Sequence, residues 1–157
     1  MIHLVFPTLG RLSAEKGQDI IPEVAKLLKD DGIKFKWFLI GDGNLRTRIE
    51  NDIEQYNLQN YIFLLGTKIN PYPYLKESDI FVQTSVYEGE CISLQEAKIL
   101  CLPIVATNFT GTNEQLEAGN LGIVTERNVK RLYSQIKKLA LDEQLIESYG
   151  RKLSLCN

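Results

Sequence analysis

The chain alternates short β-rich runs with amphipathic helical runs, and this alternation limits the folds that it can adopt. The first run, residues 2–7 (IHLVFP), is continuously apolar, as expected of a strand buried on both faces. Residues 17–30 then carry apolar side chains at helical spacing, and Pro22 falls in the first turn, where a helix tolerates proline. Strands that alternate with helices predict parallel strands joined by crossover helices.

The same alternation continues to the C-terminus. Strands are predicted over residues 2–7, 34–40, 61–65, 79–84, 103–107 and 122–124, and helices over residues 17–30, 44–56, 74–77, 93–100, 112–118, 128–141 and 142–155. We therefore expect an α/β fold in a single domain, residues 1–157, with a mostly parallel sheet and helices on both faces. Ligands bind such sheets outside the carboxyl ends of the strands, so the loops after the strands are the expected site.

Charge and composition exclude several classes of function. The 18 Lys and Arg against 20 Asp and Glu give a net charge of −2, so no bulk positive charge is available for nucleic acid, and an anion site must be local. The single histidine, His3, excludes a zinc site built on several imidazoles and is a poor base for a Ser–His–Asp triad. The three cysteines form no Cys-x-x-Cys pair, which indicates a reducing cytoplasmic compartment. Neither a run of about 18 apolar residues nor a signal peptide is recognisable, so no membrane span or secretion is expected.

The loop after the first strand carries two cations at a turn that opens a helix. Gly10, Arg11 and Lys16 lie in the sequence GRLSAEKG. A helix N-terminus offers free N–H groups and a partial positive charge, to which Arg adds a planar fork and Lys a point charge. This loop is a candidate phosphate site, and the alternative is a solvated charged loop.

The loop after the second strand contains two glycines in the sequence GDGN. Gly41 and Gly43 permit close approach of the backbone to a ligand. The loop is not a dinucleotide fingerprint, because Arg46 stands where the third glycine belongs. The alternative is ordinary turn chemistry, with Asp42 or Asn44 capping the next helix.

The loop after the fourth strand, residues 85–97 (SVYEGECISLQEA), holds two carboxylates eight residues apart. Glu88 lies on the loop and Glu96 in the first turn or two of the next helix, so both can reach one polyhydroxylated ligand. Ionised acceptors make strong hydrogen bonds to sugar hydroxyls. The alternatives are a solvated Glu88 and a Glu96 that forms a capping box with Ser93.

Together these segments, GRLSAEKG, GDGN and SDIFVQTSVYEGECISLQEAKILCLPIVAT, resemble the donor-binding half of a retaining GT-B glycosyltransferase, most closely of glycosyltransferase family 4. The resemblance runs from residue 6 to about residue 141. It implies a Rossmann-like domain, the C-terminal half of a GT-B fold, that binds a UDP-, GDP- or ADP-linked sugar for polysaccharide, capsule or lipopolysaccharide biosynthesis. It also implies an N-terminal acceptor-binding domain in the parent chain and a cytoplasmic enzyme, peripheral to the membrane in its full length, that uses no metal and no cofactor.

The resemblance also implies roles for single residues. Arg11 and Lys16 match the cations that clamp the donor diphosphate, and Glu88 matches the glutamate that contacts the transferred sugar, so these three are the expected catalytic residues. Glu96 matches the glutamate that holds the ribose hydroxyls. Further donor contacts are expected at Gly10, Gly41, Gly43, Lys68, Gly89, Glu90, Cys91 and Ile92.

The expected contacts differ in kind. The N–H groups of residues 90–93 would face the phosphates or the hexose, Gly41 and Gly43 would pass near the nucleoside, and Lys68 near the base. Glu90 and Cys91 depart from the E-G-F-G sequence that is frequent in the family, which leaves the pocket shape and the choice of donor in doubt.

Other interpretations use the same residues. The chain is an enzyme domain or, alternatively, an isolated nucleotide-sugar binding module without catalysis of its own. A nicotinamide-binding domain is disfavoured by the missing glycine fingerprint, and a receiver domain by the absence of acidic residues after the first strand. Cys91 has no neighbouring base that would make it a nucleophile. Glu88 and Glu90 have the chemistry of magnesium ligands, although the chain has no D-x-D element.

Overall fold

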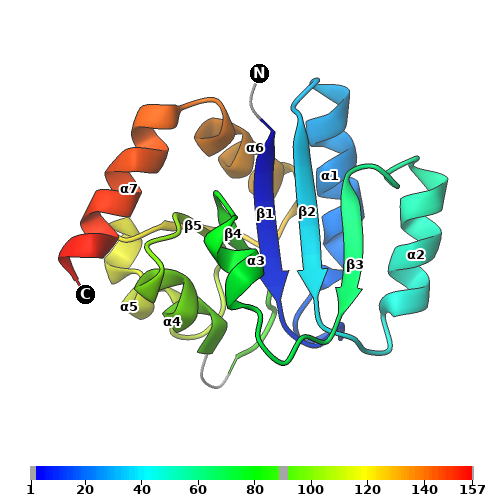
Figure 1. The fold of residues 1–157 in the computed structure, drawn as a ribbon, viewed down its shortest axis with the longest axis horizontal. Helices are drawn as coiled ribbons and strands as arrows, with labels where there is room; N and C mark the ends of the chain where they lie inside the picture. Colours follow the sequence, from blue (N-terminus) through cyan, green and yellow to red (C-terminus); the bar gives the residue numbers. More distant parts are fainter. Residues whose placement is uncertain (1–2, 89–91, 157) are drawn as a thin grey trace.

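Parallel strands run through the middle of the molecule, with helices on both sides of them (Figure 1). The structure is a computed structural model that describes residues 3–88 and 92–156. The strands are β1 (Leu4–Leu9), β2 (Phe35–Ile40), β3 (Ile62–Gly66), β4 (Phe81–Gln83), β5 (Ile104–Thr107) and β6 (Ile123–Thr125). The helices are α1 (Ile21–Asp30), α2 (Arg46–Gln55), α3 (Tyr72–Lys76), α4 (Ile92–Ile99), α5 (Thr112–Gln115), α6 (Val129–Ala140) and α7 (Glu143–Leu155), with 3-10 turns η1 (Gln18–Ile20) and η2 (Glu117–Gly119). This architecture confirms the expected Rossmann-like α/β fold.

The strands pair as two parallel three-stranded sheets, β1-β2-β3 and β4-β5-β6, that meet where β1 lies beside β4. The Leu4 N–H donates to the Lys34 carbonyl, just before β2, and the Gly10 N–H donates to the Ile40 carbonyl at the end of β2. Backbone polar groups point to the two neighbouring strands in alternation, so those of Val5 and Pro7 point toward β4. Pro7 has no N–H to donate, and the Val5 N–H bonds to the Asp79 carboxylate at 2.8 Å. At this seam, the boundary between β1 and β4, no continuous ladder of backbone hydrogen bonds therefore forms.

Two predicted helices are divided by their backbone conformation. The helix expected over residues 17–30 starts as η1 and continues as α1, with Gly17 at φ 69° just before it. The helix expected over residues 112–118 ends at Gln115, because Glu117 and Ala118 adopt φ values of 50° and 55°, outside the right-handed helical region.

The core has two apolar clusters, and the larger one extends across both sheets. The larger cluster packs α1 and α6 against β1 and β2, and its centre is the aromatic group Phe6, Phe35 and Trp37. Trp37 Nε1 donates to Thr8 Oγ1 at 2.9 Å, and Thr8 Oγ1 donates to the Val82 carbonyl at 2.8 Å. The first of these buried bonds lies within the first sheet, and the second crosses the seam from β1 to β4 and links the two sheets.

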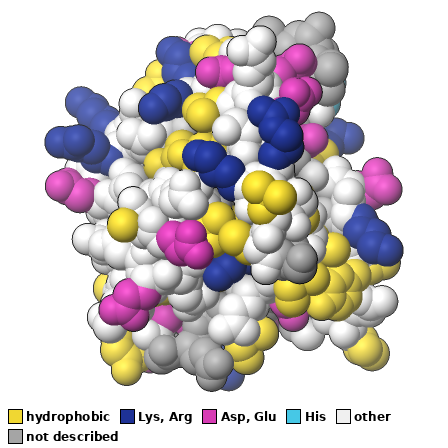
Figure 2. All heavy atoms as spheres, turned by 90° about the vertical axis from the view of Figure 1, so that its left-hand side faces the viewer, with side chains coloured by type: hydrophobic (Ala, Val, Ile, Leu, Met, Phe, Trp, Pro, Cys, Tyr) yellow, Lys and Arg dark blue, Asp and Glu magenta, His cyan; other side chains and the backbone are white. Residues whose placement is uncertain are grey.

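The face that carries α7 shows Lys and Arg side chains interspersed with Asp and Glu side chains and with apolar ones (Figure 2). Ion pairs of neighbouring residues occur on the surface, among them Arg151 with Glu147 on α7 at 3.9 Å. No helix within residues 3–88 and 92–156 has the length and apolar character needed to cross a bilayer.

Candidate functional site

A hollow of about 1110 Å³ opens at the carboxyl ends of β1 and β2, facing the start of α4. Its lining comes from the loop after β1, the loop after β2 and the first turns of α4, three segments far apart in the sequence. Six of the residues expected in the site line it: Gly10, Arg11, Lys16, Gly43, Ile92 and Glu96. The hollow thus lies at the edge of the sheet where the strand order predicts a ligand.

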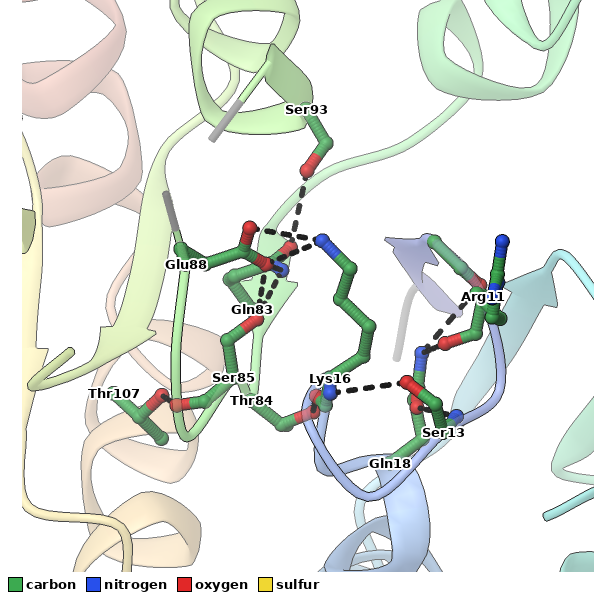
Figure 3. Close-up of polar contacts among 11 residues, drawn as sticks. Arg11, Ser13, Lys16, Gln18, Gln83, Thr84, Ser85, Glu88, Ser93 and Thr107 are labelled. Carbon is green, nitrogen blue, oxygen red and sulfur yellow. Dashed lines mark hydrogen bonds and ion pairs between the residues drawn. The ribbon is translucent and has the colours of Figure 1, made fainter. Parts of the chain in front are cut away.

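Lys16 and Glu88 form a two-pronged ion pair at the wall of the hollow (Figure 3). Lys16 Nζ donates to Glu88 Oε1 at 2.7 Å and to Oε2 at 2.8 Å. The Glu88 side chain is only 4% exposed and that of Lys16 is 30% exposed, so the cation lies between the buried carboxylate and the hollow. The alternative of a solvated Glu88 is therefore wrong, whereas in the loop after β1 Lys16 is held in this ion pair and Arg11 is exposed.

Glu88 accepts further hydrogen bonds from residues that the sequence analysis did not single out. Ser85 Oγ donates to Glu88 Oε1 at 2.7 Å, and Gln83 Nε2 lies 3.4 Å from the same oxygen. Ser85 is held in turn by Thr107, whose hydroxyl donates to the Ser85 carbonyl at 2.6 Å. Polar residues at the end of the buried run 79–84 were the one signal for this network in the sequence.

The two loops that carry Lys16 and Glu88 are held together by side chains that bond to their backbone carbonyls. Thr84 Oγ1 donates to the Lys16 carbonyl at 2.9 Å. Arg127, from the loop before α6, donates to the carbonyls of Thr84 and Gly17 at 3.2 and 3.0 Å. A Cβ atom on Gly17 would lie 2.3 Å from the Thr84 carbonyl oxygen, so only glycine allows this approach.

Gly41 and Gly43 allow a second close approach, between the loops after β1 and β2. A Cβ atom on Gly41 would lie 2.1 Å from the Gly10 carbonyl oxygen, and one on Gly43 would lie 2.3 Å from the Leu12 carbonyl oxygen. Gly43 also lines the hollow, whereas Gly41 does not. The alternative in which Asp42 or Asn44 caps α2 is wrong, because the cap position is Leu45 and no side-chain hydrogen bond caps the helix there.

Glu96 presents a buried and unsatisfied oxygen at the hollow. It lies on α4, and Oε2 has no hydrogen-bond partner among the residues that the structure describes. The capping-box alternative is wrong, because α4 already begins at Ile92 and Ser93 Oγ donates to Gln83 Oε1 at 3.4 Å. A buried acceptor without a donor costs free energy, so this oxygen is suited to a ligand hydroxyl.

Arg11 lies at the hollow, whereas the remaining expected residues lie elsewhere or outside the described part of the chain. Arg11 is exposed at the hollow, and its carbonyl accepts a bond from Gln18 Nε2 at 2.8 Å. Lys68 does not line the hollow, and its ammonium lies 5.6 Å from the ring centre of Tyr74. Gly89, Glu90 and Cys91 lie outside the described residues.

Within residues 3–88 and 92–156, no three His, Cys, Asp or Glu side chains are grouped so that they could hold a metal ion. The magnesium alternative depends on Glu90, which the structure does not describe.

Comparison with known proteins identifies the family. Residues 3–153 match the model of the family described as glycosyl transferases group 1. Poly(ribitol-phosphate) alpha-N-acetylglucosaminyltransferase of Staphylococcus aureus (strain COL) is 31% identical over 148 residues, which cover 92% of this chain and 30% of the relative. An uncharacterized glycosyltransferase of Methanocaldococcus jannaschii is 37% identical over 113 residues, which cover 71% of this chain and 28% of the relative. The chain therefore spans about a third of the length of the curated relatives that it matches.

Solved structures share the fold. A mutant of S. aureus TarM, solved in complex with Fondaparinux, alpha-GlcNAc-glycerol and UDP, has a TM-score of 0.86 at 28% identity, covering 95% of this chain and 31% of that chain. The C-terminal domain of a glycosyl transferase group 1 family protein (LpcC) from Francisella tularensis has a TM-score of 0.85 at 20% identity, covering 96% of this chain and 82% of that chain, which is a likeness of fold. The match of residues 3–153 shows that the chain belongs to the glycosyl transferases group 1 family.

Proposed function

We propose that this chain is the donor-binding domain of a family 4 glycosyltransferase, which transfers a sugar from a nucleoside-diphosphate sugar to an acceptor of polysaccharide or glycoconjugate biosynthesis. The observation that carries the proposal is the hollow in which Arg11, Lys16 and Glu96 face one space, with Glu88 bonded to Lys16 at its wall. UDP is the first nucleotide to test, because TarM, 28% identical to this chain, was solved with UDP.

The cations account for the phosphate end of the donor. Arg11 is exposed at the hollow, and Lys16 Nζ can donate to a phosphate oxygen while it remains near Glu88. Breaking the bond between the sugar and the phosphate leaves negative charge on the diphosphate. Fixed donors aimed at that charge lower the barrier, and removal of one such donor typically costs about 3–4 kcal/mol.

The carboxylates account for the hydroxyl groups of the donor. Glu96 Oε2 is a buried acceptor that a ribose hydroxyl would satisfy, and Glu88 would accept from a hydroxyl of the transferred sugar. We propose that the sugar keeps its anomeric configuration and that the two cations take the role that a metal ion plays in metal-dependent transferases.

A binding module without catalysis is the second candidate, and the length of the relatives favours it for this chain taken alone. The chain spans 30% of the S. aureus enzyme, so the acceptor site would belong to an N-terminal domain of the parent chain. In that case residues 1–157 bind the donor but transfer nothing without the second domain.

Titration of the purified chain tests the proposal. UDP, GDP and ADP, and the glucose conjugate of each, are titrated by calorimetry into the wild type and into Lys16→Ala, Arg11→Ala and the control Lys138→Ala, which lies on α6. Loss of the Lys16 or Arg11 side chain should lower the affinity for the nucleotide at least about tenfold, because a hydrogen bond to a charged group contributes roughly 1.5–3 kcal/mol. Equal affinities in the wild type and both site variants would remove the phosphate assignment.

A further inference from the structure

We infer that Gln83 is a positioning residue, whose buried amide fixes the Glu88 carboxylate for the transferred sugar and connects it to the first turn of α4. The inference rests on the proposed function, in which Glu88 contacts the sugar.

Gln83 lies at the last position of β4, between Glu88 and Ser93 (Figure 3). Its side chain is buried, with the residue 1% exposed. The Nε2 group donates to Ser85 Oγ at 2.7 Å and lies 3.4 Å from Glu88 Oε1, while Oε1 accepts from Ser93 Oγ at 3.4 Å. One amide thus joins the strand, the loop that carries Glu88 and the helix that borders the hollow.

The order of donors shows why an amide is needed at this position. Ser85 has one hydroxyl proton, which it donates to Glu88 at 2.7 Å, so its oxygen must accept from another group. Gln83 is that group, because its NH₂ faces Ser85 and its carbonyl faces Ser93. A leucine would offer neither bond, and an ionised glutamate would offer no donor.

The consequence falls on the sugar end of the site. Glu88 Oε1 accepts from Lys16, Ser85 and Gln83, so loss of Gln83 loosens both the carboxylate and the serine that orients it. The backbone of the phosphate end is anchored separately, because the Lys16 carbonyl is bonded to Thr84 and Arg11 lies on the opposite side of the turn. A substitution of Gln83 should therefore lower the affinity for a nucleotide sugar more than the affinity for the nucleotide alone.

The experiment compares UDP with UDP-glucose, and the GDP and ADP pairs in the same way, by calorimetry on the full chain. In Gln83→Leu, UDP-glucose should bind about tenfold more weakly and UDP within twofold of wild type, as expected for loss of one bond to a charged group. The control Gln115→Leu makes the same chemical change on α5, away from the hollow, and should leave both affinities unchanged. Thermal unfolding of each variant measures whether the fold is kept.

A second variant, Gln83→Glu, keeps the shape and removes the donor. The charged groups that face this position among the described residues are Glu88 and, from the loop after β1, Lys16, while α4 contributes the neutral Ser93. Two adjacent carboxylates share a proton more readily as the pH falls, and a protonated carboxyl donates again. UDP-glucose affinity of this variant, relative to wild type, should recover as the pH is lowered from about 8 to about 6.

Each outcome decides the inference. A selective loss in Gln83→Leu with recovery of Gln83→Glu at low pH supports it. Equal losses for UDP and UDP-glucose, the same loss in Gln115→Leu, or no recovery at low pH would overturn it while leaving the proposed function standing. Failure of the wild type to bind any of the three nucleotide sugars would overturn the proposed function itself.

Discussion

Lys16 and Glu88 neutralise each other at a site that we propose to bind an anion. Both carboxylate oxygens lie within 2.8 Å of the Lys16 ammonium, and the Glu88 side chain is 4% exposed. A phosphate that reaches Lys16 must therefore share the cation with Glu88. Because of this pair, the donor phosphate and the sugar-binding carboxylate of Glu88 compete for Lys16.

This competition predicts a gain of nucleotide affinity when the carboxylate is removed. Glu88→Gln keeps the size of the side chain but leaves the Lys16 charge uncompensated, so UDP should bind on the order of fivefold more tightly. The gain should shrink at high salt, because screening weakens the added attraction. The control Glu143→Gln, at the start of α7, should change nothing. Unchanged or weaker UDP binding in Glu88→Gln would show that the pair does not oppose the phosphate.

Residue type and position were enough to predict part of this site. Glu88, Glu96, Arg11 and Lys16 carry charges at the ends of predicted strands, and three of them line the hollow while Glu88 bonds to Lys16. Gln83 was not predicted, because a polar residue at the end of a strand has no periodic signal that separates it from the core. Its partners are known only once the strand, loop and helix are placed in space.

At the scale of elements, the loops after β1 and β2 depend on glycine for their contact. Gly43→Ala should lower the free energy of unfolding by about 1–3 kcal/mol and also lower the affinity for UDP, because the new methyl group would overlap the Leu12 backbone. Gly150→Ala on α7 is the matched control, since its Cβ would meet only the Cys101 carbonyl oxygen at an ordinary 3.6 Å. That variant should gain about 0.5–1 kcal/mol, the usual benefit of alanine over glycine in a helix. Urea unfolding and UDP titration of both variants measure the difference, and equal behaviour would contradict the steric account.

The end of α1 is bonded to α6 by a group that titrates. Asp31 accepts from the Tyr133 hydroxyl and from Lys137 Nζ, the latter at 3.0 Å. The Tyr133 hydroxyl, followed by Lys137, lowers the pKa of Asp31, while the bond to Asp31 raises the pKa of Lys137. A lowered aspartate pKa stabilises the fold above the value of the unfolded state, about 3.9, and this contribution is lost as the pH falls through the folded value. The raised pKa of Lys137 acts in the opposite range, because its contribution is lost as the pH rises through the folded value.

Asp31→Asn should therefore be less stable than wild type at pH 7, and the difference should disappear near about pH 2. Urea unfolding at both pH values measures this. Tyr133→Phe should cost less in the Asp31→Asn background than in wild type, because the Tyr133 hydroxyl then donates to a neutral amide oxygen instead of a carboxylate. A difference that persists at the lower pH would show that the destabilisation has another origin.

Element positions were largely predictable, and the exceptions have local causes. The predicted strand at residues 2–7 begins at Leu4 within the described residues and runs on to Leu9, because the loop that follows continues to pair with β2. The division of the sheet was not predicted, since it depends on the direction in which the Pro7 and Val5 backbones face. Apolar periodicity reports which faces are buried, but it does not report which neighbour a strand bonds.

For the whole molecule, the arrangement of two sheets side by side brings the site together. One wall of the hollow consists of the loops after β1 and β2, two strands of the first sheet. The other wall is α4, which follows β4 of the second sheet. The bond from Thr8 Oγ1 to the Val82 carbonyl links these halves across the seam. The parallel arrangement of the strands was predictable from the alternation along the chain. The contact between Lys16 and Glu88 was not, because 72 positions separate them and no local pattern reports it.

A crystal structure of the chain with a bound nucleotide sugar tests the central claim most directly. The account predicts that a phosphate oxygen lies within hydrogen-bond distance of Lys16 Nζ, a ribose hydroxyl within that distance of Glu96 Oε2, and a sugar hydroxyl within that distance of Glu88. A ligand that occupies another surface, such as the smaller hollow of about 300 Å³ at residues 108–114, with Lys16 still bonded only to Glu88, would contradict it.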